Sequence, residues 1–330
     1  MPKQVVFYQL GGAEVLQVEE QPLRDPLASE VRIKVAAIGL NRAEVMFRMG
    51  AYLEQPELPA RIGYDAAGTV DAVGDGVDHI QVGEQVATIP AFSMNAYGVY
   101  GESAIVPAHA VAAYPPSLTP SQGASVWMPY MTAWGALVHY GSLSAGQAVL
   151  ITAASSSVGI ASIQMVKEAG ATAIATTRGR NKANALVEAG ADHVVVTDEE
   201  DLAERVLAIT DDQGADIVFD PVAGPTLTEL GKATKPGGVV FVYGALATAP
   251  TPFPLMEALG RGLTVRGYTL FEVTRQPDLA ASAVNYISTR IESGAYKPLV
   301  SREFKLDDIV EAHRFMESNA QIGKIVVVTS

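Results

Sequence analysis

Short runs in which apolar and polar residues alternate characterise the first 120 residues of the chain. The apolar members of Val31-Arg-Ile-Lys-Val35 would share one face of a strand, because successive strand side chains point to opposite sides. A further valine-rich stretch is interrupted by glycines at positions 63, 68, 74, 76 and 83, which is typical of a barrel or curled sheet with tight corners. Prolines at positions 115, 116 and 120 mark the end of this β-rich region.

From about Gly123 the pattern changes to apolar strands that alternate with helical segments, which predicts a parallel sheet covered on both faces. The predicted strands are Ala148–Thr152, Ala173–Thr177, His193–Thr197, Asp216–Pro221, Val239–Gly244 and Leu263–Tyr268. The predicted crossover helices are Val158–Ala169, Asn181–Ala189, Glu199–Thr210 and Thr226–Thr234, and a proline-rich link contains Pro250, Pro252 and Pro254. Six such strands make a full doubly wound sheet.

The tail of the chain carries two more helical patterns, at Leu279–Ser293 and Asp307–Ser318, and a final strand at Lys324–Val328. We expect this tail to return to the first domain. The predicted fold class is therefore α/β. Residues 1–122 and 272–330 are expected to form a β-rich domain, and residues 123–271 a doubly wound parallel sheet.

Composition narrows the classes of partner and of chemistry. The chain has 330 residues, of which 48% are hydrophobic and 18% charged, as expected of a folded protein with a sizeable core. The net charge of −13 repels nucleic acids and anionic lipids. The absence of cysteine excludes disulfides, thiolate nucleophiles and thiolate zinc sites. We recognise no signal peptide or membrane span, which predicts a cytoplasmic protein without a membrane partner.

The first strand of the predicted sheet leads into a loop suited to phosphate. It runs through Ala153-Ala-Ser-Ser-Ser-Val-Gly159 into a helix, as in folds that bind a dinucleotide pyrophosphate at a helix N-terminus. The three glycine positions of the motif G-x-G-x-x-G hold Ala154, Ser156 and Gly159. Small side chains still let the backbone approach a phosphate, and serine hydroxyls add donors. The expected cofactor contacts in this loop are Ala154, Ser155, Ser156, Ser157, Val158 and Gly159.

Two other interpretations of this loop stay open from the residues alone. Ser157, Asp220 and His313 follow the nucleophile, acid and base order of α/β-hydrolases, although Ser155 stands where the nucleophile turn of that fold needs a glycine. Alternatively, the strand, turn and helix are only structural and bind nothing. Six ordered strands without a ligand at the switch point of the sheet would be unusual.

Basic residues follow the second strand of the predicted sheet, in Thr176-Thr-Arg-Gly-Arg-Asn-Lys182. An acidic residue at this point would accept a hydrogen bond from the ribose 2′-hydroxyl of NAD, and none is present. Arg178, Arg180 and Lys182 instead offer positive charge to a 2′-phosphate, which favours NADPH over NADH. We expect Thr177, Arg178 and Lys182 to contact the cofactor.

Seven stretches, in order along the chain, carry a family likeness. They are Gly39-Leu-Asn-Arg-Ala-Glu-Val-Met-Phe-Arg48, Leu58-Pro-Ala-Arg-Ile-Gly-Tyr-Asp-Ala-Ala-Gly68, Gly74-Asp-Gly-Val77, Val82-Gly-Glu-Gln-Val86, Met131-Thr-Ala-Trp-Gly135, the loop 153–159 with Gln164, and Gly323-Lys-Ile-Val326. Together they resemble the zinc-independent medium-chain dehydrogenases/reductases of the quinone oxidoreductase type. The resemblance implies a GroES-like first domain, a Rossmann second domain, NADPH in the cleft between them, and hydride transfer.

The same resemblance bears on metal binding. Zinc-dependent alcohol dehydrogenases supply catalytic ligands from a Cys and a His-Glu pair, at positions that here hold Asn41, Tyr64 and Asp65. The five histidines, at positions 79, 109, 139, 193 and 313, form no H-E-x-x-H motif or other close ligand pair. We therefore predict no metal site. The Tyr-x-x-x-Lys pair of short-chain reductases follows none of the twelve tyrosines, which excludes that chemistry.

The predicted chemistry follows from the lack of a metal that could stabilise alkoxide charge. The easier hydride acceptor is then a conjugated system such as a quinone, an enone or an enal, whose enolate spreads the charge. The resemblance implies that Tyr52 donates the proton and that Asn41 contacts the nicotinamide ribose or the substrate oxygen. It also implies that further cofactor contacts are Met128, Thr132, Val222, Gly244, Ala245, Leu270 and Phe271.

The sequence also leaves two alternative functions open, and the family resemblance implies a homodimer. An enoyl-thioester reductase of the same superfamily would need a basic patch for a phosphopantetheine or CoA phosphate, for which Arg42, Arg48 and Arg61 are candidates. A non-catalytic NADPH-binding sensor or structural protein would bind the cofactor without turnover. Relatives pair through the last Rossmann strand, which implies a homodimer formed along Leu263–Tyr268.

Overall fold

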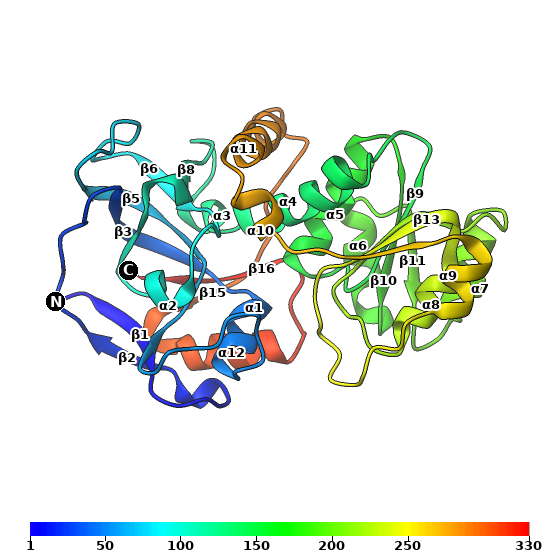
Figure 1. Ribbon diagram of the computed structural model, residues 1–330, viewed down its shortest axis with the longest axis horizontal. Helices are drawn as coiled ribbons and strands as arrows, with labels where there is room; N and C mark the ends of the chain where they lie inside the picture. The colour runs from blue at the N-terminus through cyan, green and yellow to red at the C-terminus, as the bar shows by residue number, and fades with distance from the viewer. Residues whose placement is uncertain (330) are drawn as a thin grey trace. The chain divides into compact units, whose positions relative to one another are not determined.

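The fold was obtained as a computed structural model, which describes residues 1–329. These residues form two compact units. Unit 1 consists of residues 1–128, 274–292 and 297–329, and unit 2 consists of residues 129–273 and 293–296. Most helices and strands of the two units are labelled in Figure 1.

Unit 1 is the β-rich part of the chain. Its strands are β1 (Lys3–Phe7), β2 (Gln17–Glu20), β3 (Glu30–Gly39), β4 (Ala60–Arg61), β5 (Asp65–Val73), β6 (Gln85–Thr88), β7 (Ser103–Pro107), β8 (Val111–Ala113), β15 (Val300–Lys305) and β16 (Lys324–Val328). One sheet has the order β2-β1-β4, and a seven-stranded sheet has the order β15-β16-β3-β5-β6-β8 with β7 paired to β3. The pairing of β3 with β5 shifts register twice, which bends the sheet.

The tail of the chain joins the sheet of unit 1, as the sequence predicts. Strand β16 runs antiparallel to β3, with Val327 opposite Ile38. The helices of unit 1 are α1 (Arg42–Arg48), α2 (Met94–Tyr97), α3 (Pro120–Gly123), α11 (Pro277–Glu292) and α12 (Ile309–Glu317). Helices α4 (Trp127–Trp134) and α10 (Phe271–Thr274) each contain a unit boundary.

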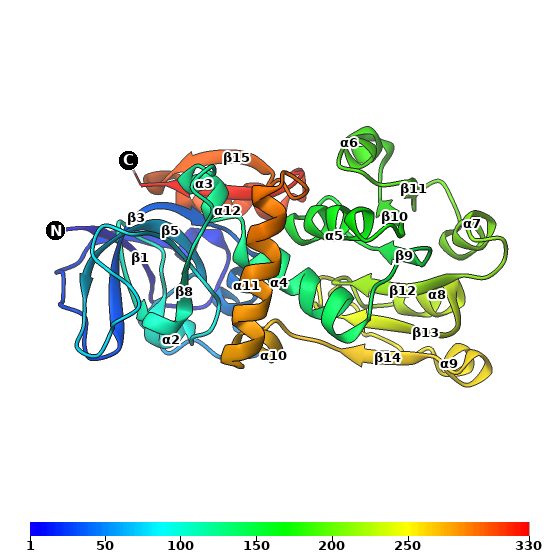
Figure 2. The same cartoon turned by 90° about the horizontal axis from the view of Figure 1, so that it is seen from above.

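Unit 2 contains one parallel sheet. Its strands are β9 (Ala148–Ile151), β10 (Thr172–Thr177), β11 (His193–Val196), β12 (Ala215–Asp220), β13 (Thr234–Val242) and β14 (Thr264–Gly267). They lie side by side in the order β11-β10-β9-β12-β13-β14 and every neighbouring pair is parallel (Figure 2). This is the strand order of a Rossmann fold, so the predicted fold class is confirmed.

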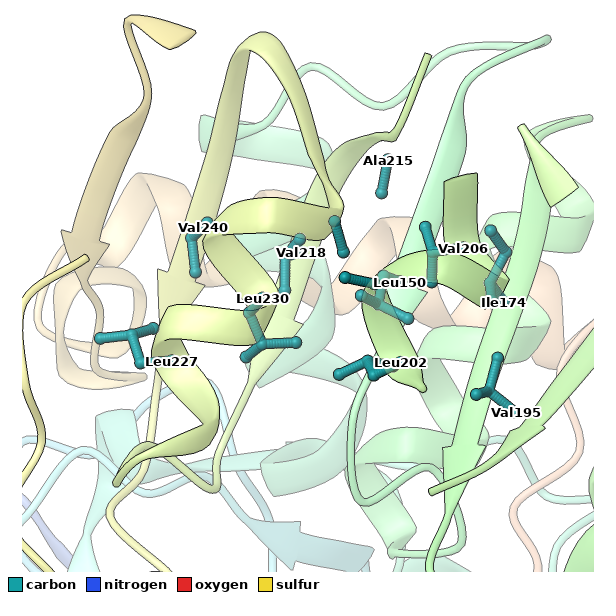
Figure 3. Close-up of a cluster of buried hydrophobic side chains, with 12 residues drawn as sticks. Leu150, Ile174, Val195, Leu202, Val206, Ala215, Val218, Leu227, Leu230 and Val240 are labelled. Carbon is teal, nitrogen blue, oxygen red and sulfur yellow. The ribbon is translucent and has the colours of Figure 1, made fainter. Parts of the chain in front are cut away.

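Unit 2 contains five further helices, of which all except the last have buried residues. They are α5 (Ser157–Glu168), α6 (Ala183–Glu188), α7 (Leu202–Ile209), α8 (Thr226–Ala233) and α9 (Leu255–Arg261). Figure 3 shows one buried cluster, in which Leu202 and Val206 of α7 and Leu227 and Leu230 of α8 pack against the sheet. The strand side chains of this cluster include Leu150, Ile174, Val195, Val218 and Val240. Because each comes from a different strand, the cluster ties five strands to two helices.

Several helices were not predicted from the sequence, among them the short α1, α2, α3 and α10. Helix α9 lies where only a proline-rich link was expected, and Pro254 is its N-cap residue. The segment from Trp127 to Tyr140, for which no element was predicted, forms α4 and then a π-helical stretch at Gly135–Tyr140. Among residues 1–329, no helix combines the length and hydropathy that a membrane span requires.

Candidate functional site

The loop between β9 and α5 is shaped for close approach of an anion. Ser156 caps the helix, and its Oγ accepts a hydrogen bond from the Gly159 N–H at 3.0 Å. The N–H groups of Ser157 and Val158 have no acceptor inside the helix, because they belong to its first turn. A side chain at position 159 would place its Cβ 2.3 Å from the carbonyl oxygen of Ala154. The loop therefore presents backbone donors and the positive end of a helix dipole.

One of the three basic residues after β10 contacts this loop, and a second is close enough to affect the charge of the first. Lys182 Nζ donates to Ser155 Oγ at 3.1 Å, and burial together with the charge of Arg178 lowers the pKa of Lys182. Arg178 is exposed, and no ion pair of its side chain is found among residues 1–329. Arg180 instead forms a bidentate pair with Glu199, with Nε at 3.1 Å from Oε2. The charge of Arg180 is thus neutralised, whereas Arg178 and Lys182 are placed to meet an anion.

The remaining expected cofactor contacts of the sheet follow the carboxyl ends of its strands. Val222 follows β12, Gly244 and Ala245 follow β13, and Leu270 and Phe271 follow β14. The strands are parallel, so all five residues lie at the same edge of the sheet as the loop after β9. Thr177, the last residue of β10, is buried and its Oγ1 donates to the Gly179 carbonyl at 3.2 Å.

The hydrolase interpretation of Ser157, Asp220 and His313 is wrong. Asp220 is fully buried, and its carboxylate accepts from Thr152 Oγ1 and from two backbone N–H groups of the turn after β12, at 3.1 and 2.7 Å. Neither ring nitrogen of His313 has a hydrogen-bond partner within residues 1–329. An acid and a base that make no hydrogen bond to each other cannot activate a serine.

Unit 1 contains a buried polar cluster formed by Asn41, Glu44, Asp65 and Lys324. Lys324 Nζ donates to Asp65 Oδ2 at 2.6 Å and to Asn41 Oδ1 at 2.5 Å. The Asn41 amide donates to Asp65 Oδ2 at 3.1 Å and to Glu44 Oε1 at 3.0 Å. Both amide hydrogens of Asn41 are therefore used inside the cluster, and only its carbonyl oxygen retains a lone pair.

The Glu44 carboxylate is the most deeply placed acid of this polar cluster. It accepts from the backbone N–H of Asn41 at 2.5 Å and of Tyr64 at 3.2 Å. Burial raises the pKa of Glu44 to about 7, against the opposing effect of the Lys324 charge. Asn41 and Asp65 could be identified from the sequence as members of a site, whereas Glu44 and Lys324 were not predicted. The spacing of Asn41 and Glu44 is that of a capping box, and this signal could have identified Glu44.

Two tyrosines lie together in unit 1. The rings of Tyr52 and Tyr64 are 6.4 Å apart and tilted by 60°, and Tyr64 is fully buried. Burial raises the pKa of Tyr52 to about 12, while a hydrogen bond with Tyr64 opposes this rise. Tyr52 therefore keeps its proton at neutral pH, and its hydrogen bond with Tyr64 favours the charged form of Tyr52 over the neutral one.

The basic patch proposed for a thioester substrate is not formed. Arg48 is fully buried, with its guanidinium bonded to Glu317 at 2.5 Å and to the Gly11 carbonyl at 2.8 Å. Arg42 donates to Asn319 Oδ1 at 2.9 Å. Burial lowers the pKa of Arg61 to about 10. The apolar residues of α1 face the core of unit 1, and this draws Arg48 inward with them.

The predicted site residues fall into two groups. Asn41, Tyr52 and the half-buried Met128 belong to unit 1, whereas Thr132, which is buried, and all residues from Ala154 to Phe271 belong to unit 2. Unit 2 brings the phosphate loop, the basic residues and the strand ends to one edge of its sheet. Unit 1 brings Asn41 into the buried polar cluster and Tyr52 against Tyr64.

Comparison with known proteins identifies the family. A family described as "Alcohol dehydrogenase GroES-like domain" matches residues 28–116, and one described as "Zinc-binding dehydrogenase" matches residues 157–287. The chain is 29% identical to the human protein named quinone oxidoreductase, over 98% of this chain and 97% of that one. The chain belongs to the medium-chain dehydrogenases/reductases of the quinone oxidoreductase type.

Solved structures of this family share the whole fold. The Escherichia coli quinone oxidoreductase complexed with NADPH has a TM-score of 0.91 and 28% identity, covering 99% of this chain and 100% of that one. The CurK enoyl reductase has a TM-score of 0.89 and 26% identity, covering 100% of this chain and 99% of that one. The family predicted from the seven sequence stretches is thus confirmed.

Proposed function

We propose that this protein is an NADPH-dependent reductase that transfers hydride to a conjugated acceptor such as a quinone, an enone or an enal. The observation that carries the proposal is the loop after β9, where the N-terminus of α5 lies beside Lys182 and Arg178. Its similarity to a quinone oxidoreductase solved with NADPH supports the same assignment.

The residues of unit 2 fit the parts of NADPH. The pyrophosphate could bind the N–H groups of Ser157 and Val158, and Gly159 lets the backbone come close to it. The 2′-phosphate could bind Arg178 and Lys182. Gly244 suits a flat group that passes close to the backbone, since a Cβ there would lie 2.8 Å from the Pro221 carbonyl oxygen. Bound NADPH supplies the hydride, and the protein supplies orientation and the proton.

Tyr52 is proposed as the proton donor. An enone or enal that gains a hydride at its β-carbon carries the negative charge as an enolate, and a proton at the α-carbon completes the reduction, whereas a reduced quinone takes its proton on oxygen. The raised pKa of Tyr52 keeps the phenol protonated until that charge develops. Tyr64 then stabilises the phenolate. Asn41 has a carbonyl lone pair left to accept from a ribose hydroxyl, whereas its amide hydrogens are taken up by the polar cluster and not by a substrate oxygen.

Two measurements test this function. NADPH and NADH are titrated into the protein, and NADPH oxidation is then followed with quinones, enals, enones and one enoyl thioester. Turnover of a conjugated acceptor supports the proposal. The similarity to CurK keeps the enoyl-thioester reductase as a second candidate, which preferred turnover of the thioester would establish. Tight NADPH binding without turnover of any acceptor would instead indicate the non-catalytic sensor.

The choice of NADPH over NADH is tested by a matched pair of variants. Arg178→Ala removes an exposed cation beside the loop, whereas Arg180→Ala removes one already paired with Glu199. We expect Arg178→Ala to weaken NADPH binding roughly ten- to a hundredfold and to leave NADH binding unchanged. Arg180→Ala should alter neither. Equal losses for both cofactors in Arg178→Ala would contradict the assignment.

We also propose a homodimer that forms along β14 and α9. Strand β14 is the last in the order of its sheet, and its outer edge is open to pairing. Beside it in sequence, α9 exposes Met256 and Leu259 by 73% and 72%. Glutamate at either position should shift the sedimenting species from dimer to monomer. Glutamate at Val187 of α6, which is 57% exposed, is the control that should leave the dimer intact. A cytoplasmic location stays a prediction of the sequence.

A further inference from the structure

The buried polar cluster of unit 1 lies where zinc-binding relatives are expected to hold their metal. Asn41, Tyr64 and Asp65 occupy the three ligand positions named in the sequence analysis. Zinc in proteins takes four ligands from thiolates, imidazoles and carboxylates, at 2.0 to 2.3 Å. Of the three residues only Asp65 belongs to that set. Within residues 1–329, no group of three His, Cys, Asp or Glu side chains could hold a metal ion. The residues present do not fit the zinc that the family description names.

A different cation already contacts these residues. The Lys324 side chain is 1% exposed, and its ammonium lies 2.6 Å from Asp65 Oδ2 and 2.5 Å from Asn41 Oδ1. Two of the three positions thus direct an oxygen at Nζ. A metal ion bound to the same two oxygens would have to displace an ammonium or share its space, and two cations at that separation repel strongly in a buried site.

The electrostatics of the cluster require this positive charge. Asp65 and Glu44 are both buried, and an isolated buried carboxylate is costly. The Lys324 charge lowers the pKa of both acids against the effect of burial. Removal of the ammonium would leave two facing acids with only amide donors.

The backbone at Gly39 leaves room for the aliphatic part of the Lys324 side chain. Gly39 ends β3, opposite Val326 of β16. A Cβ at Gly39 would lie 2.5 Å from Lys324 Cε and 2.2 Å from the Ala124 carbonyl oxygen. Any residue other than glycine at this position would push the stem out of its place. The position of the Lys324 side chain therefore depends on the glycine at position 39.

We propose that the Lys324 ammonium is the resident cation of this site, taking the position that a metal would hold and making the protein independent of zinc. The ammonium fixes the side chain of Asn41 and compensates the charge of Asp65. This inference does not depend on the proposed reductase activity, and its tests use no turnover.

The first test exploits chemical rescue. Lys324→Ala removes the atoms of propylammonium, so propylammonium chloride can refill the site when the variant is refolded with it. We expect the melting temperature of Lys324→Ala to fall by roughly 10 °C, because a buried charge has lost its partner. Propylammonium should restore most of this loss, and propanol, which has the same shape without the charge, should not. Equal rescue by propanol would show that shape and not charge is needed, and would overturn the proposal.

A second pair of variants covers the case in which Lys324→Ala does not fold. Lys324→Met keeps the length of the side chain and removes the charge, and Lys324→Met/Asp65→Asn removes both charges. We expect the double variant to fold and to melt well above Lys324→Met. A double variant no more stable than Lys324→Met would refute the charge requirement.

Metal analysis completes the test. The purified protein, dialysed against a chelator and then against zinc chloride, should retain no stoichiometric zinc. Lys324→Ala should also retain no stoichiometric zinc, because Asp65 is the single zinc ligand among the three positions. One equivalent of zinc in the unaltered protein, lost on Asp65→Asn, would show that the site holds a metal after all.

Discussion

His313 gives a pH dependence of stability that can be calculated before it is measured. Its side chain lies in α12 with no exposed surface, and neither ring nitrogen has a hydrogen-bond partner within residues 1–329. Its ring contacts that of Tyr100, with the centroids 5.9 Å apart. Burial, and to a lesser extent the charge of Arg48, lowers the pKa of His313 to about 3. The folded protein therefore keeps His313 neutral in mildly acidic solution.

The sign follows from which state binds the proton. Between the unfolded pKa of 6.5 and the folded value of about 3, the unfolded chain binds a proton that the folded chain refuses. The stability contribution of neutral His313 is thus present above pH 6.5 and is lost as the pH falls. At pH 5 the solution is about 1.5 pH units below the unfolded pKa, and each unit corresponds to about 1.4 kcal/mol, so the loss is about 2 kcal/mol.

Glu44 acts in the opposite direction over part of this range. Its pKa is raised from 4.5 to about 7, so the folded chain holds a proton that the unfolded chain releases. The stability that Glu44 contributes is present below pH 4.5 and is lost as the pH rises through 7. The pH profile of the unaltered protein is therefore the sum of two opposing trends, and a variant of His313 is needed to separate them.

The assay compares His313→Phe with the unaltered residue at pH 7.5 and pH 5.0. The chain has two tryptophans, so Trp134→Phe leaves Trp127 as the sole reporter, and Trp127 belongs to unit 1 with His313. Urea unfolding is followed by its fluorescence. Packing changes caused by the phenyl ring cancel in the difference between the two pH values. We expect acidification to cost the histidine form about 2 kcal/mol more than the phenylalanine form.

An exposed histidine of the same unit provides the control. His79→Gln should follow the unaltered protein at both pH values, because His79 is exposed. Identical pH dependence in His313→Phe and the unaltered protein would refute the reasoning. It would mean that His313 is charged in the folded state or that its unfolded pKa is equally low.

Two further predictions concern the reaction and the core. Tyr52→Phe should lower turnover of an enone roughly a hundredfold at unchanged NADPH affinity, measured by steady-state kinetics and titration, because it removes a general acid; an unchanged rate would make Tyr52 a lining residue. Leu230→Ala, in the cluster shared by α7 and α8, should cost about 2–5 kcal/mol of unfolding free energy in denaturant titration. Exposed Leu255→Ala is the matched control and should cost less than about 1 kcal/mol.

The parallel sheet could be predicted because its strands are local apolar runs of characteristic length between turns. Helix α9 could not, because its apolar residues Leu255, Met256 and Leu259 are exposed and three prolines precede it. A helix of seven residues is also too short for its 3.6-residue period to be recognised in the sequence. The segment from Trp127 to Tyr140 was missed for a different reason. It is apolar on nearly all sides, so it has no polar face to reveal a helical period.

The candidate site likewise has a part formed by residues that are consecutive in the sequence and a part formed by residues that only folding brings together. The phosphate loop is a continuous stretch from Ala153 to Gly159, and its use can be inferred from the strand before it and the helix after it. The contact of Lys324 with Asn41 joins residues 283 positions apart and depends on the register of β16 against β3. Arg48 looked available for a phosphate, yet its helix faces the core and buries it. Only the folded structure decides such pairings.

The two groups of site residues differ in whether their positive charge is available to a ligand. In unit 2 the helix N-terminus, Arg178 and Lys182 leave positive potential available for an anionic ligand. In the buried polar cluster of unit 1 the ammonium of Lys324 is already taken up by Asp65 and Asn41. The reduction of some acceptors places a full negative charge on one oxygen. The buried polar cluster has no cation to stabilise that charge, because the Lys324 ammonium already bonds Asp65 and Asn41. A conjugated acceptor spreads its charge and then needs only a proton, which the high pKa of Tyr52 keeps in place. The proposed preference for conjugated acceptors is therefore supported by the charge balance of unit 1.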